Sequence, residues 1–229
     1  MNVIPRHSIA KKGLMAATGL MLCMFLVLHL AGNLTLLLQD DGSLTLAPGG
    51  PQSNEFFEWV AHHYEAIPAF FHTGELLLLA LFGIHALFGI TLWLQNRAAR
   101  GSRYVRQRSE GGRTVFSATM PYTGLCFIAV FLVIHLVNFR FGSQEGPADM
   151  YTLVGDVFGR WYWMLIYVAA LGGVAFHLGH GVQSAFQSLG LRHPRYTPVI
   201  RVLGYLFAAA MFVGFGCLPI LFYFNGAMS

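Results

Sequence analysis

Four of the ten histidines in this chain lie at corresponding places inside four long apolar stretches, where a polar or metal-binding side chain is unusual. They are His29, His85, His135 and His177. A neutral imidazole binds metals through a ring nitrogen, and it also carries protons near neutral pH. No cysteine or acidic residue accompanies these four histidines as a further ligand. A single histidine of this kind is as often a hydrogen-bonded structural residue, so the positions of all four must decide their role.

The composition excludes several classes of protein. The 229 residues are 55% hydrophobic and only 10% charged, whereas soluble domains average about 25% charged residues. A water-soluble globule and a disordered chain are both excluded. The three cysteines are isolated and form no CxxC or CxxCH motif, which excludes a disulfide scaffold and covalently attached c-type haem.

Five apolar stretches are each long enough to cross a bilayer, which takes roughly 20 helical residues. They cover about 13–38, 69–95, 114–140, 161–190 and 200–225, and their only acidic residue is Glu75. The first stretch is too long for a signal-peptide core and is expected to be retained. The sequence therefore predicts an all-α membrane protein in which residues 1–229 form one domain of five transmembrane helices.

The basic residues are concentrated in three of the predicted connections. Twelve of the fourteen Lys and Arg lie in the N-terminal segment, in the loop near residues 97–113, or near residues 192–201. The first loop has five acidic residues and no base. The positive-inside rule predicts a cytoplasmic N-terminus and an outer C-terminus. The net charge of +4 thus indicates a membrane face rather than a nucleic-acid partner.

The four histidines fall at matching depths in the first four predicted helices. Each lies roughly 16–21 residues, or about 24–31 Å, after the start of its apolar stretch. Because successive helices run in opposite directions, His29 and His135 share a level near the outside. His85 and His177 share a level nearer the cytoplasm. Two pairs at two depths are typical of axial ligands for two b-type haems, each held by two histidines.

Small residues accompany the histidines on their helix faces. A porphyrin needs a flat recess beside its ligand, so we expect glycines near the histidines to pack against haem: Gly32, Gly89, Gly124, Gly173 and Gly181. Ordinary close packing of helices is the alternative for any one of these glycines. His180 lies one turn beyond His177, where a haem propionate or a backbone group is a more suitable partner than iron.

Several segments resemble one known family, the single-subunit, five-helix, di-haem cytochrome b anchor of succinate dehydrogenases and fumarate reductases. The first is Ser8-Ile9-Ala10-Lys11-Lys12-Gly13-Leu14-Met15 with Thr18-Gly19 and His29-Leu30-Ala31-Gly32-Asn33-Leu34. The others are Ile84-His85-Ala86-Leu87-Phe88-Gly89, Ile134-His135-Leu136-Val137-Asn138 and Phe176-His177-Leu178-Gly179-His180-Gly181. The resemblance extends over nearly the whole chain.

The resemblance implies that His29 and His135 hold a distal haem b, while His85 and His177 hold a proximal haem b. It also implies a multi-pass protein of the cytoplasmic (inner) membrane that exchanges electrons with a quinone, often menaquinone. A flavoprotein subunit carrying FAD and an iron–sulfur subunit would be the partners, and they would carry out the dicarboxylate chemistry. Some fumarate reductase relatives have a glutamate where this chain has Ala175, and its absence favours succinate oxidation.

Glu75 is the candidate for proton transfer to a quinone. It lies ten residues, or about 15 Å, before His85, which places it near the level of His29 and His135. Quinone reduction consumes protons, and a carboxylate can deliver them, with His72 as a relay from water. The alternative is a carboxylate without a function in catalysis, either at the membrane rim or at the helix N-terminus, where the helix dipole favours an acid.

Two other functions remain open at this stage. A b-type anchor of a hydrogenase, formate dehydrogenase or ferric reductase would also place histidines in a helix bundle. A transporter or channel with a histidine metal site belongs to a different class, but it usually shows helix breaks or acidic residues along its path.

The arginines near 97–113, with Ser8 and Lys11, are expected to contact the iron–sulfur subunit or the propionates of the proximal haem.

Overall fold

A computed structural model describes residues 8–37, 62–63, 66–98, 115–142 and 150–226, and every regular element in these ranges is helical. The first half of the chain forms α1 (Ser8–Leu34), a 3-10 turn (Thr35–Leu37) and α3 (Pro68–Ala98). The middle forms α4 (Val115–Tyr122), η3 (Thr123–Ile128), α5 (Ala129–His135) and η4 (Leu136–Arg140). The last part forms α6 (Met150–Phe158), α7 (Trp161–Ser188) and α8 (Thr197–Gly226).

Four helices are long and apolar enough to cross a membrane: Ile9–Leu37, Pro68–Ala98, Trp161–Ser188 and Thr197–Asn225. Large apolar side chains remain exposed along them, such as Leu28 at 66% and Leu76 at 67%. A water-soluble protein would bury such surface, whereas lipid covers it without cost. The predicted multi-pass membrane character is confirmed for these four helices.

The third predicted span, 114–140, is wound continuously from Val115 to Arg140 but alternates between α- and π-helix. The segments η3 and η4 are both π-helical. Pro121 precedes η3 and has no N–H to donate to the preceding turn, a common cause of irregular winding. π-helical turns often mark functional sites. Because this stretch is not one regular α-helix, the fifth membrane crossing stays a prediction.

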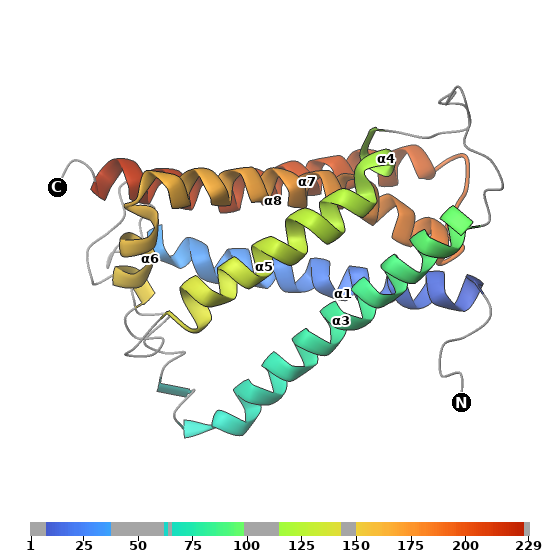
Figure 1. Cartoon of the computed structure of the whole chain (residues 1–229). Helices are drawn as coiled ribbons and strands as arrows, with labels where there is room; N and C mark the ends of the chain where they lie inside the picture. Colours follow the sequence, from blue (N-terminus) through green and yellow to red (C-terminus); the bar gives the residue numbers. More distant parts are fainter. Residues whose placement is uncertain (1–7, 38–61, 64–65, 99–114, 143–149, 227–229) are drawn as a thin grey trace.

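Successive long helices run in opposite directions, and the start of α1 and the end of α8 lie at opposite ends of the bundle (Figure 1). α7 and α8 pack along one another, and α1 packs against α3, α7 and α8. Gly214 permits a close approach of α8 to α1, because an added Cβ there would lie 2.7 Å from a Leu30 methyl carbon. The buried core nearest His135 joins Leu36, Leu37, Val154, Phe158, Tyr167, Leu218 and Phe222.

The two remaining elements lie at an angle to this core. α3 diverges from the other helices toward its Pro68 end (Figure 1). In the third predicted span, α4 and η3 pack on α7, whereas α5 and η4 slant away from it (Figure 1). This divergence leaves room beside the histidines.

Candidate functional site

The structure brings the four predicted histidines together as two pairs. The ring centroids of His29 and His135 lie 5.8 Å apart, and their planes are nearly perpendicular at 89°. The centroids of His85 and His177 lie 6.1 Å apart at an interplanar angle of 76°. These are the pairs expected from the depth of each histidine in its helix. We call His29 and His135 the upper pair, and His85 and His177 the lower pair.

In the lower pair, α1 holds the ring of His85. Its Nδ1 donates to the carbonyl oxygen of Met15 at 3.1 Å and lies 3.3 Å from the hydroxyl oxygen of Thr18. An added Cβ at Gly19 would lie only 3.0 Å from Cε1 of the same ring. Because Nδ1 carries the proton in this arrangement, Nε2 keeps the lone pair that a metal requires.

The other ring of the lower pair, His177, packs against the π-helical segment η3. An added Cβ at Gly124 would lie 3.2 Å from its Cε1. The Nδ1 atom of His177 is buried and has no hydrogen-bond partner among the described residues. A glycine thus permits the close approach of a neighbouring helix at each histidine of the lower pair.

The upper pair has an aromatic surrounding. His29 stacks on Phe25 at 5.2 Å, and the amide nitrogen of Asn33 lies 3.4 Å from its Nδ1. His135 contacts Phe131, Phe139 and Tyr167, with ring centroids 5.3–6.2 Å apart. Its Nδ1 is buried and, within the described part of the chain, unpartnered.

The separation of the two levels follows from helix geometry. The lower pair lies beside Thr18 and Gly124, and the upper pair contains His29 and His135. Eleven residues separate the two levels in the first helix and also in the third predicted span. At 1.5 Å per residue this places the pairs about 16 Å apart.

One continuous cavity of about 2130 Å³ contains both pairs. It extends from Glu75 to Arg97, which lie near opposite ends of α3, and its lining is mostly apolar. Pockets for one drug-sized ligand have about 300–1,000 Å³, so this cavity has room for more than one large ligand.

Polar groups line the cavity near the Arg97 end. Asn96 and Arg97 come from α3, and His180, Ser184 and Ser188 come from α7. Arg97 also lies 5.8 Å over the ring of Trp93. A cation and hydroxyl groups at this end suit an anionic ligand group. Lys11 is buried but does not line the cavity, and the side chain of Ser8 lies outside the described part of the structure.

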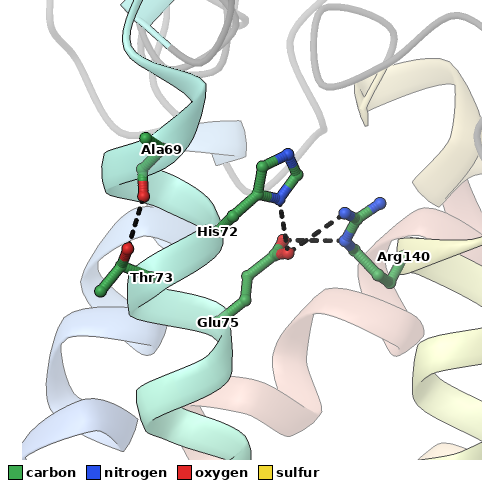
Figure 2. A network of polar contacts seen from close by, with 5 residues as sticks. All are labelled: Ala69, His72, Thr73, Glu75 and Arg140. Atoms are coloured by element: carbon green, nitrogen blue, oxygen red, sulfur yellow. Dashed lines mark hydrogen bonds and ion pairs between the residues drawn. The ribbon is translucent and has the colours of Figure 1, made fainter.

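Glu75 takes part in a polar network at the opposite end of the cavity (Figure 2). Arg140 at the end of η4 donates to it twice, from Nε to Oε1 at 2.8 Å and from Nη2 to Oε2 at 3.2 Å. Nδ1 of His72 lies 3.5 Å from Oε2. The three side chains are about half exposed, and all three line the cavity.

The five glycines expected to pack against haem do not all lie in one environment. Gly32, Gly89, Gly124 and Gly181 line the cavity. Gly173 is outside the lining, and an added Cβ there would lie 2.9 Å from Cβ of Phe127. Its role is therefore close packing of α7 against η3, which the sequence had offered as the alternative for such a glycine.

Sequence reasoning left several site residues without a role. Gly19 and Thr18 were noticed only within a family-like segment, although both contact His85. Arg140 was given no role, although it donates to Glu75. A glycine ten residues before His29, close to the eleven-residue spacing of Gly124 before His135, is the signal that would have identified Gly19. The arginines at 100–113 lie outside the described residues.

The residues present fit two haems better than bare metal ions. Within the described residues no three His, Cys, Asp or Glu side chains gather in a metal-binding group. Each pair offers two imidazoles, the number that the iron of a porphyrin takes as axial ligands. A bare ion such as zinc needs three or four protein ligands. The shared cavity supplies the apolar volume. The buried Nδ1 atoms of His135 and His177 have no partner among the described residues, so hydrogen bonds there do not account for either histidine pair.

Comparison of the chain with protein-family models, with curated proteins and with solved structures gives no match.

Proposed function

We propose that this chain is the di-haem cytochrome b membrane anchor of a succinate:quinone oxidoreductase. The observation that carries the proposal is the presence of two histidine pairs, about 16 Å apart, in one apolar cavity of a membrane-type helical bundle. In this role His29 and His135 ligate the distal haem, and His85 and His177 ligate the proximal haem. The haems, when bound, supply one-electron transfer across the bundle.

The residues around the lower pair orient a ligand rather than react. The Met15 carbonyl fixes the tautomer and the rotation of the His85 ring, which keeps Nε2 directed to one place. Gly19 and Gly124 keep the neighbouring helices close enough to confine both rings. Asn96, Arg97, His180 and the serines of α7 are suited to the propionates of the proximal haem.

The proposed topology has five membrane crossings, with the third formed by Val115–Arg140. The N-terminus and the arginine-rich loop then face the cytoplasm, because basic residues are retained on that side of the inner membrane. That face contacts the iron–sulfur subunit, which carries electrons from a flavoprotein subunit that holds FAD. This chain supplies the quinone reaction and the partners supply the dicarboxylate chemistry.

The proposed quinone site lies at the Glu75 end of the cavity, beside the upper pair. Glu75 lies about 15 Å along α3 from His85, and therefore close to the level of His29 and His135. A carboxylate there exchanges protons with the quinone head group, and His72, 3.5 Å away, exchanges them with water. Menaquinone is the quinone implied by the resemblance.

Single replacement of each histidine by alanine tests the pairing. H29A and H135A should each lose the same haem spectrum and keep the other, whereas H85A and H177A should lose the second. The control is H193A, because His193 is exposed, does not line the cavity and belongs to neither pair. Redox-titrated visible spectra of the purified variants give the result. Loss of both haems or of neither in H29A would overturn the pairing.

A further inference from the structure

Arg140 and Glu75 form an ion pair between two elements that otherwise diverge. Glu75 lies near the start of α3, whose main packing partner is α1. Arg140 is the last residue of η4, in the half of the third predicted span that slants away from α7. Both side chains also line the cavity. The pair therefore spans the side of the cavity where its walls separate.

The contact between Arg140 and Glu75 has the geometry of a strong ion pair. Two nitrogens of one guanidinium reach the two oxygens of one carboxylate, at 2.8 and 3.2 Å (Figure 2). Such two-point contacts fix the orientation of both groups as well as attracting them. A lysine in place of Arg140 could hold the charge but not the plane of the carboxylate.

Exposed apolar residues flank the ion pair on both sides. Leu76 and Leu79 of α3 are 67% and 61% exposed, although both also line the cavity. Phe141, which follows Arg140, is 70% exposed and lines it as well. Residues that are exposed and also line a cavity border its opening. Because α3 is a membrane-type helix, this opening faces the apolar phase in which a quinone dissolves.

We propose that Arg140 is a positioning residue that fixes the Glu75 carboxylate beside the lateral opening of the cavity and ties α3 to η4 there. The inference rests on the proposed quinone site and adds to it the residue that holds its proton-exchanging group. The ligand admitted through this opening is a membrane-dissolved quinone, whose head group meets the carboxylate before it reaches the upper histidine pair.

Four variants separate the position of the carboxylate from the presence of the ion pair: R140Q, R140K, E75Q and the charge swap E75R/R140E. The separation of α3 and η4 is measured between spin labels on cysteines introduced at Leu77 and Val137, after replacement of the native cysteines. Both sites are exposed, and neither lines the cavity. Quinone turnover and the KM for quinone are measured on the assembled complex without labels.

The proposal predicts a longer or broader distance distribution in R140Q and E75Q than in the parent, and a parent-like distribution in the charge swap. R140K should be intermediate in distance and retain most turnover, with a raised KM. R140Q should lose about tenfold or more in turnover while both haem spectra stay intact. The swap should not recover turnover, because it moves the carboxylate from position 75 to position 140.

An unchanged distance distribution in R140Q would overturn the tie between α3 and η4. Full turnover in the charge swap would overturn the positioning of Glu75 as the role of Arg140. If the unmodified complex shows no quinone turnover, the proposed function fails instead, and the distance measurement still decides whether Arg140 holds the two helices together.

Discussion

Gly19 is the residue that sets how closely α1 approaches His85. The space beside its Cα is filled by the imidazole, which an added Cβ would meet at 3.0 Å. The histidines themselves can be picked from the sequence, because a histidine within an apolar stretch is rare. Gly19, Thr18 and the Met15 carbonyl cannot be picked in this way, because their contacts with His85 depend on the rotation of α1 about its own axis.

Gly19→Val should displace the His85 ring and selectively impair the lower haem. The three carbons of the added isopropyl group, at a site already in contact, force the ring or the helix to move, and such overpacking costs about 1–3 kcal/mol. Haem content and redox-titrated spectra should show loss or shift of one haem only. Gly13→Val is the control on the same helix, because nothing lies within 4 Å of an added Cβ there. Equal effects of both variants would refute the role of Gly19.

Glu75→Gln should keep the shape of the side chain and abolish its titration. Since general acid–base groups contribute about 10²–10⁴-fold, quinone turnover should fall by about 10²-fold or more. Both haem spectra should remain unchanged. Thr73→Val is a nearby control, because among the described residues the Thr73 hydroxyl donates to the carbonyl oxygen of Ala69 in the preceding turn and to no cavity group. Normal turnover in Glu75→Gln across the working pH range would place the quinone elsewhere.

Among the helices, the length of each uncharged stretch predicts the helix bounds well, but it does not predict whether the winding is regular. The second span, expected at about 69–95, is observed as Pro68–Ala98, and the fourth, expected at about 161–190, as Trp161–Ser188. α1 begins at Ser8, earlier than expected, because the helix continues through the polar Lys11 and Lys12 beyond its apolar part. Hydropathy marks the stretch that suits the membrane, whereas backbone hydrogen bonding decides where a helix begins and ends.

The two π-helical segments of the third span are the largest departure from the expected regular helix. Each adjoins one level of the site: η3 contains Gly124 beside His177, and η4 begins directly after His135. Pro121 offers a sequence signal for η3, but no comparable residue in the described part of the span marks η4. His135, next to η4, contacts Tyr167 of α7, and a single sequence does not reveal such tertiary contacts.

For the whole molecule, the number of crossings decides on which sides of the membrane the two ends lie. Five crossings place the ends on opposite sides, and four place them on the same side. A reporter that is active only outside the cytoplasm should be active when fused after Asn225 and inactive when inserted within the arginine-rich loop at 99–114. Inactivity at both sites would indicate four crossings, and activity in the loop would contradict a cytoplasmic N-terminus.

The central claim is that each histidine pair holds one haem b. Its most direct test is the haem content of the purified, full-length chain, measured as haem b per polypeptide together with the low-spin signals of the oxidised protein. If each pair holds one haem, the measurement gives two haems b per chain with two resolved low-spin, bis-histidine signals. A chain that carries one haem or none after expression with sufficient haem would contradict the claim.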